Sequence, residues 1–447
     1  MHSRLSILYF LQFAVWGCYL SCFGQLLGAG GIGADIQWFY AAVGLVSLIT
    51  PALMGHLSDR FVPSLRLLGT CHLFAALFMM GAWLYTSTCT EFSFWPIFLI
   101  YVGFLAFYMP TMALSNTTTF ALLKRKGLQP VDVFPVIRIW GTIGFVAAMW
   151  FVNSAYIYNG EFGFTLNDLN PAATYRFQYT PMQLFSSSIL GLLTALYTLS
   201  LPATEVPDPG KSSSLGDIFG FKAFKMFKLK DVRVFLIFAI FTGVCLQISN
   251  GYAVPFINHF MGIEEFAGSL AAGNATMLFS LSQISEAAFI LITGIAMKRI
   301  GFKTVITIAL VAWCLRFLFL GIGNPGPGLV WLILSMVVYG ISFNFFNIAG
   351  HIYMDQRSDH TTRGFGQGLL MMMSNGIGAT GGMIAAGAII NHYCRWDMVP
   401  IGETGNSIRL FMGDWEAPWL IFAAYSLLIA ILFYLFFRRK TIHQTER

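Results

Sequence analysis

Apolar and polar residues in this chain gather into long blocks rather than alternating every two to four positions. A membrane-spanning helix needs about 20 mostly apolar residues, so each long apolar block is a candidate span. We count twelve such blocks, with the approximate bounds 5–27, 36–58, 67–87, 95–117, 134–156, 183–202, 234–257, 270–297, 304–323, 327–352, 364–390 and 416–437. Backbone polar groups find no water in lipid, so each block is expected to be a helix. The first block mimics a signal peptide, but it runs on to Leu27 and no small-residue cleavage site stands out, so we interpret it as a span.

Composition and charge agree with a polytopic membrane protein. The 447 residues are 57% hydrophobic and 10% charged, whereas a soluble chain carries about 25% charged residues. If the N-terminus is cytoplasmic, all but five of the 26 Lys and Arg residues fall in or beside cytoplasmic loops; the exceptions are Arg138, Arg176, Arg316, Arg395 and Arg409. The excess of positive charge on one side predicts that both termini are cytoplasmic. The net charge of +6 follows from these loops and does not indicate nucleic-acid binding.

The longest cytoplasmic connection divides the spans into two sets of six. We predict a six-helix bundle over 1–202, a cytoplasmic linker over 203–233, a second six-helix bundle over 234–437 and a cytoplasmic tail over 438–447. Residues 217–230 have the pattern of an amphipathic helix on the membrane surface, and a plain linker is the simpler alternative.

The two halves share a short pattern at the same place. Gly55-His-Leu-Ser-Asp59-Arg60 follows the second block, and Gly294-Ile-Ala-Met-Lys298-Arg299 follows the eighth. Related halves are typical of transporters whose substrate site lies at the membrane midplane between them. The first stretch also resembles the loop motif of the major facilitator superfamily. That resemblance implies a gating role for Asp59 and Arg60, which would pair with neighbouring helix ends on the inner face.

Of the 20 acidic residues, only Glu286 lies near the middle of a predicted span. An ionised carboxylate at that depth is costly, so it is expected to face a cavity or a partner. Gln283 lies three residues earlier on the same helical face, and together the two side chains indicate a ligand site. The alternative is a structural pair with Arg316, which the helical rise places at a similar depth.

Three further spans carry polar and aromatic residues at helical spacing. Arg138, Thr142 and Phe145 share one face and suit a polar, ring-bearing solute, although Arg138 alone can also reach the lipid headgroups. Gln247 and Asn250 share a face of the seventh span. The last group, in the tenth span, is Tyr339, Phe343 and Asn344. Buried amides bind ligands or join helices, and aromatic pairs stack on ligands or pack, so these interpretations stay open. The glycines of the eleventh span indicate close helix packing or a flexible, moving helix.

Other chemistry is not indicated. The sequence shows no nucleophile–base arrangement, no His and Cys metal cluster and no phosphate-binding loop, so we expect neither an enzyme nor a catalytic, metal or cofactor site. Most of the seven cysteines lie in apolar blocks and fit no zinc spacing. A disulfide between Cys89 and Cys394, both in predicted outer loops, is the one pairing left open.

The sequence resembles the bacterial nucleoside:proton symporters, a branch of the major facilitator superfamily that includes the enteric nucleoside and xanthosine permeases. The resemblance covers nearly the whole chain. Its stretches are Phe10-Leu-Gln-Phe13…Trp16-Gly17, Tyr108-Met-Pro110-Thr, Ile137-Arg-Ile-Trp-Gly-Thr-Ile-Gly-Phe145, Leu246-Gln-Ile-Ser-Asn250, Ser282-Gln-Ile-Ser-Glu286, Val311-Ala-Trp313…Leu315-Arg-Phe317 and Tyr339-Gly…Phe345-Phe-Asn347. The run that ends at Phe145 is the most specific.

The resemblance implies an all-α polytopic protein of the major facilitator fold, with twelve transmembrane helices in two six-helix halves. It implies a monomer in the bacterial inner membrane that takes up nucleosides such as uridine and adenosine together with protons. The substrate residues it implies, with Tyr339 and Asn344 added as neighbours, are Arg138, Thr142, Phe145, Gln247, Asn250, Gln283, Glu286 and Phe343.

One position departs from the family pattern. The enteric members carry Asp after the Phe of the tenth span, whereas this chain has Asn344, which cannot take up a proton. Proton coupling then rests on Glu286 alone or is absent. A proton-independent nucleoside facilitator is therefore the main alternative. A major facilitator transporter of another polar solute, such as a sugar, and a sensor that binds nucleoside without moving it are further alternatives.

Overall fold

Helices make up most of the computed structural model, which describes residues 1–205, 226–266, 268–357, 363–400 and 407–437. The longer helical elements are α1 (His2–Gly17), α2 (Phe23–Ala29), α3 (Ile36–Arg60), α4 (Ser64–Thr88), α5 (Phe94–Arg125), α6 (Pro130–Ser154), α7 (Met182–Thr198), α9 (Lys230–His259), α11 (Ala275–Ile322), α12 (Leu329–Arg357), α13 (Arg363–Met371), the π-helical η7 (Met372–Gly378), α14 (Ala379–Tyr393) and α15 (Glu416–Phe436). Short elements connect them: the 3-10 turns η1 (Gly33–Asp35), η2 (Ala173–Tyr175), η3 (Phe177–Tyr179), η5 (Phe260–Gly262) and η6 (Glu264–Phe266), and the single turn α10 (Leu270–Gly273).

The helices of the structure agree with some of the twelve expected spans and differ from others. Within the described residues, nine helices are long and apolar enough to cross a membrane, and Met182–Thr198 and Ala275–Ile290 are shorter apolar helices. The first expected span is broken between α1 and α2, at 18–22. The eighth and ninth spans are joined in α11, where Gly301 has φ 77° and turns the chain. A side chain would strain that backbone, so glycine suits the connection.

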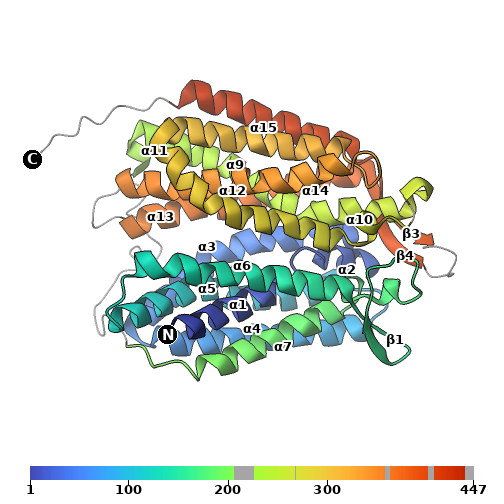
Figure 1. Cartoon of the computed structure of the whole chain (residues 1–447), viewed down its shortest axis with the longest axis horizontal. Coiled ribbons are helices and arrows are strands. Elements are labelled where there is room, and N and C mark those ends of the chain that lie inside the picture. The colour runs from blue at the N-terminus through green and yellow to red at the C-terminus, as the bar shows by residue number, and fades with distance from the viewer. Residues whose placement is uncertain (206–225, 267, 358–362, 401–406, 438–447) are drawn as a thin grey trace, which may run out of the picture.

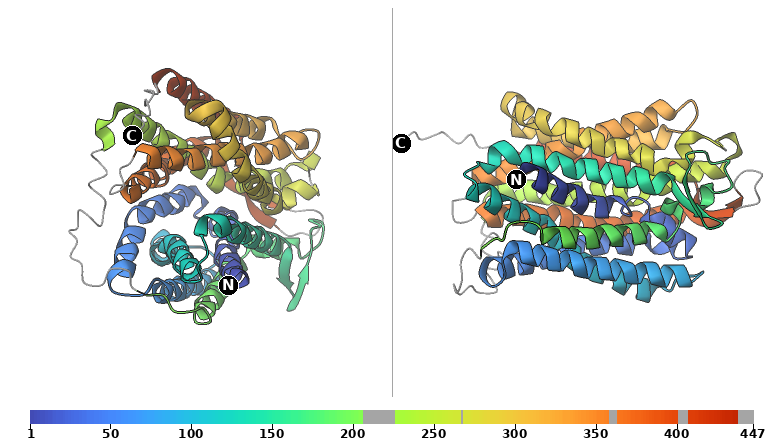
Figure 2. Two further views of the ribbon diagram at one scale, coloured as in Figure 1. Left: turned by 60° about the vertical axis from the view of Figure 1, so that its left-hand side comes forward. Right: turned by 60° about the horizontal axis from the view of Figure 1, so that its bottom comes forward.

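The helices before residue 200 and those after 229 form two groups that lie side by side (Figures 1 and 2). In the first group α1 packs on α6 and α7, and α4 packs on α5 and α7. In the second group α11 packs on α12 and α15, and α9 packs on α14 and η7. Across the groups, α3 contacts α14 and η7, and α6 contacts α11. Residues 206–225 of the predicted linker and the predicted tail 438–447 lie outside the described residues.

Two β-hairpins, which the hydropathy pattern did not predict, lie at one end of the helices (Figure 1). Strand β1 (Ala155–Tyr158) pairs antiparallel with β2 (Glu161–Phe164), and β3 (Cys394–Pro400) pairs antiparallel with β4 (Ser407–Gly413). Asn159 and Gly160, both with positive φ, form the two-residue turn of the first hairpin. We call this end the hairpin end, and the opposite end, where α1 begins and α15 ends, the terminal end. Cys89 and Cys394 are both free thiols, so the disulfide left open above is not formed.

A buried polar network joins the two groups of helices at the hairpin end. The Arg176 guanidinium forms an ion pair with Asp168 at 2.5 Å, and it also donates to the side-chain oxygen of Asn274 at 2.9 Å. Asn153 of α6 donates to the same oxygen at 2.7 Å. Arg176 is fully buried, and its charge is compensated by a carboxylate that is itself almost fully buried.

A second contact at the hairpin end is aromatic. Trp396 of β3 lies against Gly28 and Gly33, where an added Cβ would come within 2.1 Å of its ring atoms. Only glycine leaves room for the indole at these two places. The ring of Trp396 also stacks on Phe411 of β4, with 4.9 Å between the ring centroids. The second hairpin is therefore packed directly on α2 and η1.

Candidate functional site

A cavity of about 810 Å³ lies between the two groups of helices. Its lining comes from α1, α3, α5, α6, α9, α11, α12, α13 and η7. The lining residues reach toward the terminal end, to Ala52 on α3, Asn116 on α5 and Gly368 on α13. The hairpin end is closed by the contacts described above. The cavity is therefore central and lies on the terminal side of the closure.

Nine of the ten predicted substrate residues line this cavity. They are Arg138, Thr142, Phe145, Gln247, Asn250, Gln283, Glu286, Tyr339 and Phe343. They come from four helices of both groups, α6, α9, α11 and α12. The regular helical spacing read from the sequence therefore placed each group on one face, and the fold turned the four faces toward one another.

Glu286 and Arg138 supply opposite charges to the cavity from α11 and α6. The two charges attract each other electrostatically, but no nitrogen–oxygen pair of theirs comes within 4.0 Å. The Arg138 guanidinium lies over the ring of Phe13, 4.1 Å from its centroid. This position in the cavity favours the ligand interpretation of Arg138 over contact with lipid headgroups. A solute between the two groups would meet both charges.

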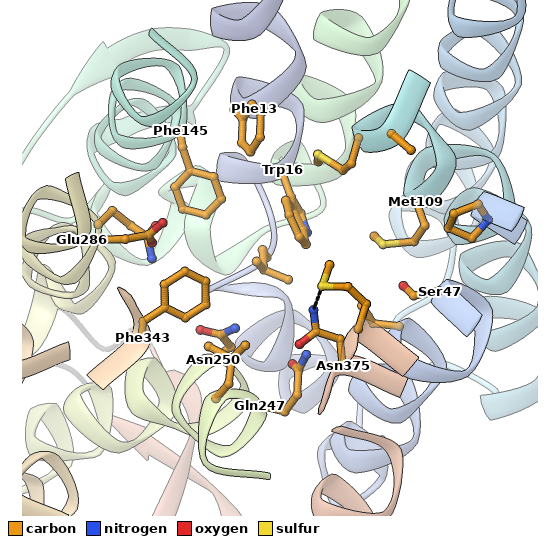
Figure 3. Close-up of a pocket in the computed structure, with 18 of the residues that line it drawn as sticks. Phe13, Trp16, Ser47, Met109, Phe145, Gln247, Asn250, Glu286, Phe343 and Asn375 are labelled. Atoms are coloured by element: carbon orange, nitrogen blue, oxygen red, sulfur yellow. Dashed lines mark hydrogen bonds between the residues drawn. The ribbon is translucent and has the colours of Figure 1, made fainter. Parts of the chain in front are cut away.

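Close helix packing fixes the aromatic part of the lining. An added Cβ on Gly17 of α1 would lie 2.3 Å from the carbonyl oxygen of Phe145, so α1 and α6 touch through their backbones there. This contact sets the depth of the Phe145 ring in the cavity. On the opposite group, Tyr339 and Phe343 of α12 stack with 5.7 Å between centroids and 8° between planes. Both groups of helices thus present an aromatic face (Figure 3).

The amides of Gln247 and Asn250 are available to a ligand. Both line the cavity from α9 (Figure 3), and among the described residues neither side chain hydrogen-bonds to another protein group. Buried amides without partners cost free energy, so a bound solute or water is expected to complete their hydrogen bonds. This favours the ligand interpretation of these two residues over a role in joining helices.

Arg316 does not pair with Glu286. It is fully buried behind the cavity, where its guanidinium donates to the hydroxyl of Ser249 at 2.7 and 2.9 Å and to the carbonyl of Ser335 at 2.8 Å. Its carbon centre lies 4.6 Å from the ring centroid of Tyr339. The structure therefore gives Arg316 hydrogen bonds and a cation–π contact, and leaves the Glu286 carboxylate in the cavity.

Asn344 is the predicted substrate residue that does not line the cavity. Its side chain is buried between α12 and α11, and its nitrogen donates to the backbone carbonyl of Glu286 at 2.6 Å. The i, i+1 step from Phe343 turns it away from the cavity, because neighbours on a helix point about 100° apart. Asn344 thus contacts the helix that carries Glu286. Of the two predicted gating residues, Arg60 ends α3 at the terminal end, and the side chain of Asp59 lies outside the described part of the structure.

Sequence reasoning missed several lining residues. Phe13 and Trp16 of α1 enter the cavity (Figure 3), and the stretch that carries both was noted only as a family resemblance. Ser47 of α3 gave no signal, because a lone serine in an apolar block is common. Asn375 of η7 lies in the glycine-rich eleventh block, which we interpreted as packing.

Comparisons with known proteins match the chain over nearly its whole length. The family model described as nucleoside H+ symporter matches residues 1–442. The xanthosine permease of Escherichia coli (strain K12) is 34% identical over 99% of this chain and 97% of its own length. Nucleoside permease NupG of the same organism is 35% identical over 98% of this chain and 96% of its own. A crystal structure of nucleoside transporter NupG matches with a TM-score of 0.81 at 34% identity, covering 98% of this chain and 99% of that chain.

The expected fold class, an all-α polytopic membrane protein of the major facilitator type, is confirmed by its likeness to solved transporter structures. The matching permeases place this chain among membrane transporters rather than among a class of enzymes. Both the family model and the relatives extend over nearly the full length of the chain. The chain belongs to the nucleoside H+ symporter family.

Proposed function

We propose that this protein takes up nucleosides together with protons by alternating access, with the nucleoside bound in the central cavity. The observation that carries this function is the combination of groups that meet there. A carboxylate, a guanidinium, two amides without protein partners and aromatic rings from both groups of helices line one cavity. A nucleoside offers hydroxyls, a polar base edge and a flat ring, which match these groups one by one.

The ribose and the base are assigned to different parts of the cavity. A carboxyl group can hydrogen-bond two neighbouring hydroxyls in either state, by accepting from both when ionised or by donating to one and accepting from the other when protonated. Glu286 therefore suits the ribose, with Gln283 on the same helical face. Phe145 and Phe343 lie beside Glu286 and extend toward the centre of the cavity (Figure 3). Their rings suit stacking on the base. The edge of the base would then point toward Gln247.

The terminal end is assigned to the cytoplasm, in the bacterial inner membrane. The positively charged loops fall at that end, where α3 ends and α4 begins and where α5 ends and α6 begins. With this orientation the structure is inward-facing, because the cavity reaches the terminal end and the hairpin end is closed. The two six-helix halves, 1–202 and 234–437, would rock about the cavity to open the hairpin end. We assign a single chain as the working unit, because both groups of helices that line the cavity belong to the same chain and can rock against each other within it.

Glu286 is assigned the role of proton carrier. It would be protonated from the outside when the hairpin end is open, and would release the proton to the cytoplasm with the nucleoside. The names of the family and of NupG concern nucleosides, and the family name also includes the proton.

The test is uptake of labelled uridine and adenosine into cells that express the chain, with and without a protonophore. Uptake that exceeds that of cells with an empty vector, and that falls to equilibration when the protonophore is added, is expected. A competition panel defines the solute. If glucose displaces labelled uridine no worse than adenosine does, the nucleoside assignment fails.

Asn344 favours a second candidate, a proton-independent nucleoside facilitator. Its neutral amide is hydrogen-bonded to the Glu286 carbonyl, at the position where the family resemblance leads us to expect an acid. Uptake with the same initial rate and the same final level in the presence of protonophore would establish the facilitator and exclude the symporter.

A further inference from the structure

The segment η7 between α13 and α14 has a π-helical turn, Met372–Gly378. A single π-helical turn within an α-helix is rare in proteins, and where one occurs it often lies at a functional site. The extra residue in the turn changes the direction in which the neighbouring side chains point. Met372 and Asn375 of this turn line the central cavity. No other asparagine or glutamine of the eleventh block lies in the cavity among the residues that the structure describes.

Backbone contacts with both groups of helices hold this turn in place. An added Cβ on Gly44 of α3 would lie 2.8 Å from the carbonyl oxygen of Asn375. An added Cβ on Gly243 of α9 would lie 1.9 Å from the carbonyl oxygen of Ser374. The turn therefore packs tightly between α3 and α9, and neither Gly44 nor Gly243 has space for a side chain where it meets the turn. A side chain presented by so closely packed a backbone has a defined position in the cavity.

The side-chain amide of Asn375 is poorly satisfied by the protein. Its nitrogen donates to the sulfur of Met371 at 3.5 Å, drawn as a dashed line in Figure 3, and a thioether is a weak acceptor. Its oxygen lies 3.4 Å from the hydroxyl of Ser374. The Ser374 hydroxyl has one proton, which it donates to the carbonyl oxygen of Leu370 at 3.0 Å. That proton is therefore not available to the side-chain oxygen of Asn375. The amide keeps both donor and acceptor capacity for a bound molecule.

The position of Asn375 selects which part of a nucleoside it meets. Figure 3 shows Asn375 next to Gln247, across the cavity from Glu286, with Phe145 and Phe343 on the Glu286 side. A base stacked on those rings, with its ribose at Glu286, presents its far edge to Asn375. That edge carries a donor and an acceptor side by side in both purines and pyrimidines, and a side-chain amide matches such a pair in either order.

We propose that Asn375 is a further nucleoside-binding residue, which hydrogen-bonds the edge of the base and so determines how strongly the transporter distinguishes bases. This role rests on the proposed nucleoside function and deepens it. Because an amide matches both donor–acceptor orders, Asn375 would let one cavity accept both adenosine and the pyrimidine nucleosides.

The experiment compares nucleosides that differ by one group. Uptake of labelled adenosine is inhibited with unlabelled adenosine, with purine riboside, which lacks the 6-amino group, and with 2′-deoxyadenosine, which lacks a ribose hydroxyl. Wild type is expected to prefer adenosine to purine riboside by roughly tenfold, the usual size of one good base contact. In Asn375→Ala this preference is expected to fall to about twofold or less. The preference over 2′-deoxyadenosine is expected to stay as in wild type. Cytidine and pyrimidin-2-one riboside test the same contact on a pyrimidine.

Two control variants separate contact from structure. Gln283→Ala, on the Glu286 side, is expected to reduce the preference over 2′-deoxyadenosine and to leave the preference over purine riboside. Asn347→Ala removes an amide that bonds its own helix, at the Phe343 carbonyl, and is expected to change neither. If Asn375→Ala does not yield folded protein by size-exclusion chromatography, Asn375→Ser is measured in the same way.

The possible results separate the role of Asn375 from the proposed transport function. If wild type takes up nucleosides and the folded Asn375 variant keeps the wild-type preference over purine riboside, the role of Asn375 is refuted while the proposed function stands. Loss of the 2′-deoxy preference instead would overturn the assignment to the base edge. If wild type takes up no nucleoside, the proposed function itself fails.

Discussion

Replacing Glu286 by Gln should convert the transporter from concentrating nucleosides to equilibrating them. Among the residues that line the described cavity, Glu286 is the only carboxylate, so the cavity can carry one proton per nucleoside on an acidic side chain. Glutamine has almost the same shape and keeps a hydrogen-bonding group for the ribose, but it cannot be protonated or ionised. The variant is therefore expected to move nucleoside without a proton.

The expected accumulation follows from that single carboxylate. One proton moved with a neutral nucleoside carries one charge, and 100 mV across the membrane supplies about 2.3 kcal/mol per charge. Since each 1.4 kcal/mol is a factor of ten, wild type should accumulate nucleoside about 50-fold at 100 mV with equal pH on both sides. Two coupled protons would give about 2,500-fold by the same calculation. The Glu286→Gln variant should reach a ratio of about one.

The assay uses purified protein in vesicles, with the potential set by a potassium gradient and valinomycin. The internal and external concentrations of labelled uridine are measured at steady state. Uridine counterflow, which needs no proton gradient, shows that the Gln variant is folded and moves substrate. Accumulation near 50-fold by a variant that passes the counterflow control would refute the assignment of Glu286. Wild-type accumulation above 1,000-fold would refute the single-proton stoichiometry, and a wild-type ratio of one with normal counterflow would establish a facilitator.

Three further substitutions test the packing around the site. Arg316→Met leaves the serine groups it binds without partners and should lower stability by about 1–3 kcal/mol; an unchanged melting temperature in detergent would contradict this. Gly28→Ala forces a Cβ to within 2.1 Å of the Trp396 ring and should weaken closure of the hairpin end by about 1–3 kcal/mol. In a Gln25→Cys background, at a position whose native side chain donates to the carbonyl of Arg409 on β4, the new thiol should then react faster with an impermeant maleimide. Gly81→Ala, whose added Cβ would meet Ile100 at an ordinary 3.9 Å, should not change the rate. Asn344→Asp can donate to the Glu286 carbonyl only while protonated, so uptake by this variant should fall as pH rises; a pH profile parallel to that of Asn344→Ala would exclude this.

The sequence determined the class of protein and most of the candidate site. Lipid allows only backbones that satisfy their own hydrogen bonds, so long apolar blocks predict helices with little ambiguity. Helical periodicity then placed Arg138, Thr142 and Phe145 on one face, and the same reasoning held for Gln247 with Asn250. A carboxylate at membrane depth is costly enough that Glu286 alone indicated a cavity.

Only the tertiary structure decided which side chains face the cavity and which side chains pair with each other. The depth of Arg316 and Glu286 allowed an ion pair, but the serine hydroxyls around Arg316 satisfy the guanidinium and leave the carboxylate free. Periodicity placed Asn344 beside Phe343 without showing that the next residue on a helix turns away from the cavity. Asn375 could not be found from its spacing, because its position depends on a π-helical turn held by glycines on two distant helices.

The closure at the hairpin end also depends on pairings between distant segments that the sequence pattern does not show. Asp168 and Arg176 lie in a predicted outer loop and Asn274 lies near the start of the predicted eighth span, so nothing in the sequence brings the three together. The fold buries them side by side, and burial is what turns three separate polar residues into a fixed contact between two groups of helices. Local pattern thus sets which residues are apolar, helical or charged, because those properties belong to each segment alone. Pairing across the cavity and across the closure depends on how segments far apart in the sequence pack, and no single segment carries that information.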